Sequence, residues 1–246
     1  VDAKINDVLT EMNMNLKSMA FKIDSKGELS CRYGIVDSDF SVVYDGNKTV
    51  YFGKGRAKKF TYIPLGPFEK SIKIKEAVNQ GVTFSGDVHK VEVKASNAVK
   101  ATLLDEKFDV DSSETIVSYD IDKELLTVHT KAKLNTAYLK ADVESFVEDG
   151  NGLKYHGTVS NPTDISLHMD NSALKNAVAS YAGDDNTIKV NLKTAAGNIN
   201  VYSHGYDRYD FDASLKELKP LFADGVEASI GGEIKGKYEY SKDEVS

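Results

Sequence analysis

The segment from Thr163 to Tyr202 contains both hydrophobic periods that occur along this chain. In its first half, apolar residues recur at i, i+3, i+4 and i+7, the spacing of one helix face, and this predicts a helix over 171–182. Its inward residues would be Leu174, Ala177, Val178 and Tyr181. In the second half, Ile188–Leu192 and Ile199–Val201 alternate apolar with polar residues, as half-buried strands do. The segment predicts a β-α-β-β unit with its helix laid across an antiparallel sheet.

Helix-like and strand-like segments also share the rest of the chain. Many short alternating segments read as strands, separated by turn residues at Ser25–Gly27 and Asp45–Asn47 and by the hairpin loop Asp149–Gly152. Three more segments have an apolar stripe at helical spacing. The four predicted helices are 2–12, 67–79, 171–182 and 214–220.

A polar, acidic stretch divides these helices into two pairs. Residues 105–114 read DEKFDVDSSE. A segment this polar and acidic cannot be buried in a core, so we expect a linker there. The expected domains are 1–108 and 115–246. Two short helices against antiparallel strands on each side predict an α+β fold built from a duplicated domain.

Composition narrows the class of protein. Lys and Arg total 31 against 38 Asp and Glu, a formal net charge of −7, which argues against a chain that coats nucleic acid over its whole surface. No stretch approaches the ~18 consecutive apolar residues of a membrane span, and the first residues have no apolar signal core. A single cysteine, Cys31, excludes an internal disulfide framework. We therefore expect a cytoplasmic or nuclear protein that is not secreted and does not bind a membrane.

Catalytic and metal-binding patterns are absent from the sequence. The five histidines stand singly, without the spacing that pairs them into a metal site. Cys31 lies on an alternating segment, which indicates a buried thiol rather than a nucleophile. The sequence thus predicts no enzyme, no metal and no cofactor.

Lysines gather on the outward faces of the predicted helices. Any one of them is explained by lysine being a good helix former on a wet surface. Together they predict a surface that meets a phosphate backbone without reading its sequence. The residues expected to face DNA are Lys4, Lys17, Lys70, Lys73, Lys75, Lys175, Lys216 and Lys219.

Three stretches resemble DNA sliding clamps of the T4-like phage and PCNA types. Ile5–Ser30 resembles the opening helix and hairpin of that family, Asp164–Tyr202 the start of its second domain, and Asp210–Tyr240 its final helix and strands. The resemblance implies a viral replication protein: a ring, expected to be a homotrimer, that encircles duplex DNA and slides on it. A DNA polymerase and a clamp loader would be its partners.

A second function fits the same alternating strands. Long segments such as Leu125–Lys131 and Lys140–Val147 also suit a β-rich carrier whose sheets curve around a lipid-like ligand, or a viral structural protein that builds a tube. Both alternatives are without catalytic activity.

Overall fold

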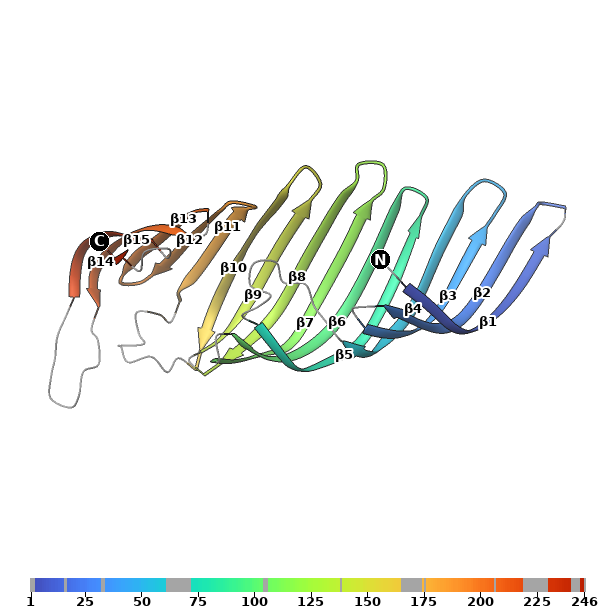
Figure 1. The fold of residues 1–246 in the computed structure, drawn as a ribbon, viewed down its shortest axis with the longest axis horizontal. Helices are drawn as coiled ribbons and strands as arrows, with labels where there is room; N and C mark the ends of the chain where they lie inside the picture. Colours follow the sequence, from blue (N-terminus) through green and yellow to red (C-terminus); the bar gives the residue numbers. More distant parts are fainter. Residues whose placement is uncertain are drawn as a thin grey trace. The chain divides into compact units, whose positions relative to one another are not determined.

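The protein is a meander of antiparallel strands in which each strand pairs with the next along the chain. The computed structural model describes residues 3–15, 17–31, 34–60, 72–103, 106–137, 139–164, 174, 176–205, 207–218, 230–239 and 244–245. Figure 1 shows consecutive strands lying side by side, and their hydrogen-bonded order is the sequence order, β1 to β16. Every connection between described neighbours is thus a simple antiparallel return.

The chain divides into two compact units, Val1–Thr130 and Lys131–Ser246, with the division inside β8. The strands up to that point are β1 (Ala3–Asn15), β2 (Ala20–Cys31), β3 (Gly34–Tyr44), β4 (Thr49–Phe60), β5 (Ile72–Asp87), β6 (Lys90–Leu103), β7 (Glu106–Asp120) and β8 (Leu125–Thr136). Those that follow are β9 (Lys140–Asp149), β10 (Leu153–Thr163), β11 (Val178–Asp184), β12 (Thr187–Thr194), β13 (Gly197–His204), β14 (Arg208–Leu218), β15 (Ile230–Glu239) and β16 (Glu244–Val245).

The predicted α+β fold with paired helices is wrong. Residues 3–12 form most of β1, 72–79 open β5, and 214–218 end β14, while 67–71 and 219–220 lie outside the described residues. In the segment 171–182, the structure describes one residue in 3₁₀ conformation, Leu174, and from Asn176 onward a turn and strand β11. None of the residues that the structure places belongs to an α-helix.

A short apolar run fits both the helical period and the strand period of two residues. In this chain, pairing with neighbouring strands selects the strand. Ile72-Lys73-Ile74-Lys75 alternates strictly, and its backbone pairs with β6. The expected helix core around Tyr181 is lost for the same reason. Val178 and Tyr181 point to opposite faces of β11, Val178 is 40% exposed, and Ala177 is buried just before the strand.

Two of the predicted turns are confirmed and one is wrong. Asp45-Gly46-Asn47 joins β3 to β4, and the Asp149–Gly152 loop joins β9 to β10 with Gly152 at φ 112°. Ser25–Gly27 instead lies within β2. The expected linker 105–114 is strand β7 from Glu106 onward, and the boundary between the units falls at Thr130.

Among the described residues the sheet is a single layer, so neither unit has an interior of large side chains. The buried apolar side chains in this part of the chain are alanines, Ala141, Ala177 and Ala196, and the largest fully buried side chain is that of Ser203. A folded domain normally buries one face of a sheet against a second layer. Here the larger apolar side chains stay half-buried or exposed.

Aspartates at the start of several hairpins satisfy the backbone amides of the turn. Asp45 Oδ1 accepts hydrogen bonds from the amides of Asn47 and Lys48, both at 2.9 Å. Asp87 Oδ1 accepts hydrogen bonds from the backbone amides of the second and third residues that follow it. Asp184 Oδ1 does the same. Each loop therefore begins with an Asx turn, which fixes the two-strand return.

These hydrogen bonds lower the pKa of the capping carboxyls. An ion pair with Lys48, 2.8 Å away, and two backbone amides lower the pKa of Asp87 from 3.8 to about 2. The pKa values of Asp45 and Asp184 are also lowered, chiefly by the turn amides, and that of Asp120 by its hydrogen bond to Lys123. Because the folded pKa values lie below the unfolded ones, the stabilisation is complete above about pH 4 and is lost as pH falls toward 2.

We expect the melting temperature of the wild-type protein to fall steeply between pH 4 and pH 2. Asp87→Asn keeps the capping oxygen but removes the charge, so it should lower the melting temperature at pH 7 and weaken its dependence on pH in this window. Asp87→Ala removes both and should melt lower than Asp87→Asn at pH 7. Thermal melts followed by circular dichroism at pH 7, 4 and 2.5 measure both effects. An unchanged pH profile in Asp87→Asn would contradict the assignment.

Candidate ligand-binding face

In each unit, one face of the sheet is apolar and the other is charged. Residues that pair directly across an antiparallel ladder point to the same face, and successive residues point to opposite faces. The pairing registers can therefore be followed from strand to strand. In each unit they assign every side chain to one of two faces of the sheet. We name these the apolar face and the charged face.

On the apolar face of the first unit, in-register residues form rows without a charged member. One row consists of Met12, Ile23, Val42, Tyr51, Gly86, Val91 and Tyr119. The next consists of Thr10, Ser25, Phe40, Gly53, Phe84, Val93 and Val117. These rows cross the strands from β1 to β7.

The second unit repeats this arrangement across β9 to β15. One row consists of Val147, Tyr155, Gly183, Ile188, Ser203, Tyr209 and Tyr238. The central row consists of Ser145, Gly157, Tyr181, Val190, Val201, Phe211 and Gly236. A third consists of Val143, Val159, Ala179, Leu192, Ile199, Ala213 and Ile234. None of these rows contains a charged residue.

The apolar face of the first unit carries aromatic rings laid over glycines of the adjacent strand. Tyr51 on β4 pairs with Gly86 on β5, and Phe84 on β5 pairs with Gly53 on β4. A methyl group added at Gly86 would lie 2.7 Å from the Tyr51 ring, so the ring occupies the space over the glycine. The exchange is reciprocal because each strand carries an aromatic residue two positions before its glycine. Such cover protects backbone that a glycine would otherwise expose.

The second unit has the same reciprocal exchange between β10 and β11. Tyr155 pairs with Gly183, and Tyr181 pairs with Gly157. A methyl group added at Gly183 would lie 2.5 Å from the Tyr155 ring. Phe211 covers Gly236 on the neighbouring strand in the same way. The rings thus lie along the sheet rather than standing on it, which leaves a low apolar surface.

Tyrosine hydroxyls on these faces donate to backbone carbonyls at the hairpins. Tyr44 donates to the carbonyl of Gly46 and Tyr51 to that of Asp87, both at 2.7 Å, and Tyr155 to that of Thr187 at 3.4 Å. Burial raises the pKa of the Tyr51 hydroxyl, which keeps it a neutral donor. These three hydroxyls are thus turned to the ends of the strands, whereas the hydroxyl of Tyr181 lies over Gly157 in the central row of the second unit.

Parts of the apolar faces are open to solvent. Met12 is 55% exposed and Met14 51% on β1, Tyr119 is 38% exposed on β7, and Ile234 is 47% exposed on β15. In the described part of the chain no second layer covers them. Apolar rows that run across several strands and are partly open to solvent are typical of a surface to which something else binds.

The opposite face of each sheet carries the charges. In the first unit one of its rows consists of Lys26, Asp39, Lys54, Thr83, Lys94 and Ile116. In the second unit one consists of Glu148, Lys154, Asp184, Thr187, His204, Arg208 and Glu239. Both rows contain charges of opposite sign on neighbouring strands, as on a solvated surface.

The lysines predicted to face DNA are spread over several strands of both units. Lys4 lies on β1, Lys73 and Lys75 on β5, and Lys216 on β14, while Lys17 is exposed in the turn after β1. The others, Lys70, Lys175 and Lys219, lie outside the described residues. For the described lysines the prediction that helices carry them is wrong, and the contact of all eight with DNA stays a prediction.

The sequence signal for the apolar faces is the triplet aromatic-x-glycine. It occurs at Tyr51–Gly53, Phe84–Gly86, Tyr155–Gly157 and Tyr181–Gly183. Period-two spacing puts both members of a triplet on one face, and an antiparallel neighbour with the same triplet completes the exchange. Neither the apolar faces nor this triplet was among the features predicted from the sequence.

Within the described ranges, no group of three or more histidine, cysteine, aspartate or glutamate side chains is placed to hold a metal ion. The same part of the chain has no helix with the length and apolar character that crossing a bilayer requires. No protein-family model, curated protein or solved structure matches this chain.

Proposed function

We propose that the chain is a non-catalytic carrier whose apolar sheet faces hold the hydrocarbon chains of a lipid. The observation that carries this proposal is a single-layer sheet with uncharged rows on one face in each unit. The described residues place no protein layer over those rows. A lipid chain would cover these rows in the way that a second protein layer usually does.

The chemistry of the face favours a ligand segment without hydrogen-bonding groups. The hydroxyls of Tyr51 and Tyr155 already donate to the carbonyls of Asp87 and Thr187. Over the rings and aliphatic side chains that make up most of these rows, a polar ligand group would lose its hydrogen bonds to water without replacing them. A methylene group has no such hydrogen bonds to lose. Each methylene removed from water contributes about 0.8 kcal/mol, so a long chain can bind without a deep pocket.

The length of the rows also suits a long chain. The central row of the second unit crosses seven strands, from Ser145 on β9 to Gly236 on β15. With a strand spacing of about 4.8 Å, six intervals span about 29 Å. One leaflet of a bilayer holds its chains in about 15 Å of hydrocarbon, so an extended acyl chain fits along one row.

We expect the purified wild-type protein to bind a fluorescent long-chain fatty acid saturably. Unlabelled hexadecanoate should displace the probe and butanoate should not, because binding depends on methylene count. Solvent extraction of freshly purified protein followed by mass spectrometry should recover lipid. Folded protein that neither yields lipid nor binds the probe would refute the carrier. So would a dimer in sedimentation whose dissociation exposes the apolar faces, since a second copy would then be their cover.

No described feature favours the polymerase clamp. That hypothesis depended on helices that present lysines to DNA, and the structure has strands at 3–12, 72–79 and 214–218. Processivity and ring formation stay predictions, and a labelled duplex included in the binding assays tests them directly.

A further inference from the structure

A hollow lies on the charged face of the first unit, above Gly81. It has a volume of about 580 Å³ and is bordered by residues of β3, β4, β5, β6 and β7. Gly81 pairs with Ser96, which places its missing side chain on the same face as Thr83 and Lys94. A methyl group built at Gly81 would meet nothing within 4 Å, so the space above this residue is open.

Small residues form the floor of this hollow, next to irregularities in the ladder. The floor consists of Gly81 and Thr83 on β5 and Ser96 on β6. The register shifts between Asn79 and Gly81, and again one strand further along, after Asn97. Bulges bend a strand locally and re-aim side chains. Here they coincide with a floor that has two hydroxyl groups and no bulky side chain.

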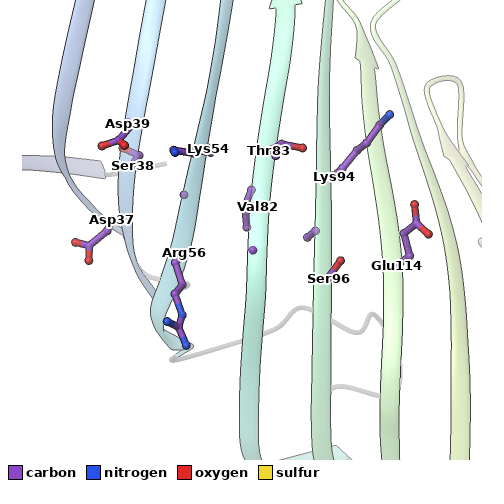
Figure 2. Close-up of a pocket in the computed structure, with 13 residues that line it drawn as sticks. Asp37, Ser38, Asp39, Lys54, Arg56, Val82, Thr83, Lys94, Ser96 and Glu114 are labelled. Atoms are coloured by element: carbon purple, nitrogen blue, oxygen red, sulfur yellow. The ribbon is translucent and has the colours of Figure 1, made fainter.

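Basic residues flank the floor on both sides. Lys54 and Arg56 come from β4, and Lys94 from β6. Lys54 and Lys94 both pair with Thr83, from opposite sides, so their backbones lie about two strand spacings, or about 10 Å, apart. Figure 2 shows the Lys54 amine on the β3 side of its strand and Lys94 extending toward β7, with Thr83 between the two strands.

The carboxylates of the hollow stand one strand further out. Asp37 and Asp39 lie on β3 and pair with Arg56 and Lys54, and Glu114 lies on β7. The backbones of the basic residues are therefore next to the floor and those of the acidic residues form the rim, while the amines of Lys54 and Lys94 are turned outward. Once these side chains turn inward, an anion on the floor would lie nearer to the cations than to the carboxylates. A cation in the same place would meet the reverse order of charges.

The basic side chains are able to turn toward a ligand. Among the described residues, no ion pair within 4.0 Å joins Lys54 or Arg56 to a carboxylate, and Lys94 contacts Glu92 at 3.3 Å. Exposed side chains of this kind change rotamer within nanoseconds. An anion on the floor can thus draw them inward without a change in the sheet.

We propose that this hollow binds a phosphate group. The Arg56 guanidinium can donate two parallel hydrogen bonds to phosphate oxygens, and Lys54 and Lys94 supply point charges from two sides. The hydroxyl of Thr83 can donate from below, and Gly81 leaves room for the tetrahedral group. The site lies on the opposite side of the sheet from the apolar face, so this inference does not depend on the lipid proposal.

Titration with inorganic phosphate, followed by amide NMR and calorimetry, tests the site. We expect saturable shifts of the Gly81, Thr83 and Lys94 amides and an affinity that falls with added salt. The variant Lys54→Gln/Arg56→Gln should bind at least tenfold more weakly. Gly81→Val, which fills the hollow while leaving every charge in place, should do the same. Lys22→Gln, on the charged face but paired with Asp24 outside the hollow, should leave affinity unchanged.

Two further ligands distinguish a lipid headgroup from free phosphate and test whether the site is specific for phosphate. Glycerol 3-phosphate binding more tightly than inorganic phosphate would assign the site to a phosphoglyceride headgroup, and equal affinity would assign it to the free anion. Acetate that competes as well as phosphate would overturn the proposed class. Wild-type affinity in Lys54→Gln/Arg56→Gln, or equal weakening by Lys22→Gln, would overturn the site. Failure of the fatty-acid assay would leave all of these results unaffected.

Discussion

Replacing Gly86 with alanine is expected to lower the free energy of unfolding by about 1–3 kcal/mol, the cost of forcing a methyl group into filled space. The new Cβ would lie 2.7 Å from the Tyr51 ring and 2.8 Å from its hydroxyl oxygen, and closer still to the carbonyl of Lys90. The ring is held in place by its hydrogen bond to the carbonyl of Asp87, 2.7 Å away. Relief of the clash would break that bond and move the strand, and urea unfolding measures the loss.

Gly81 provides the matched control because it lies five residues earlier in the same strand. An alanine Cβ there meets nothing within 4 Å, and Gly→Ala at an unstrained position commonly stabilises by about 0.4–1 kcal/mol. Gly81→Ala should thus be neutral or stabilising while Gly86→Ala destabilises. Tyr51→Val should recover part of the Gly86→Ala loss, because it removes the ring but leaves the carbonyl of Lys90. Equal stability of Gly81→Ala and Gly86→Ala would mean that the rings do not lie over the glycines.

A feature of this fold was predictable from the sequence where the residues that determine it are close together along the chain. The loops at Asp45–Asn47 and Asp149–Gly152 were predictable, since a turn depends on its own residues. Their short length also predicts that consecutive strands are neighbours. The alternation of Ile188–Leu192 and Ile199–Val201 correctly indicated β12 and β13. These features depend on residues close together in sequence.

The prediction of helices was wrong because it depended on local spacing, whereas the structure depends on pairing between strands. Val178 and Tyr181 fit a helix face when read alone, yet β11 lies between β10 and β12, which pair with its backbone on both sides. Gly27 was predicted to be a turn residue, although in β2 it pairs with Ser38, which in turn pairs with Gly55 on β4. The apolar faces follow from registers between strands, which periodicity within one strand cannot give. The reciprocal aromatic-x-glycine triplets are the sequence feature that points to them.

Placing a carboxylate on the apolar face of the second unit is expected to weaken fatty-acid binding at least tenfold. Val201 is half-buried in the central row, between Val190 and Phe211, so Val201→Glu would put a charge directly beneath the proposed acyl chain. The charge would have to lose water when the chain binds, and no cation lies in that row to compensate. Binding of the fluorescent fatty acid measures the effect.

The control for this change lies three residues earlier on the same strand. Asn198 is exposed on the charged face, where it pairs with Lys193, so Asn198→Glu adds the same charge without touching the apolar rows. It should bind fatty acid as the wild type does. Val201→Thr, which keeps the shape and β-branching of valine, guards against misfolding and should weaken binding by a smaller factor. If folded Val201→Glu and Asn198→Glu bind equally well, hydrocarbon does not rest on this face and the carrier proposal fails, since the face is the site that it assigns.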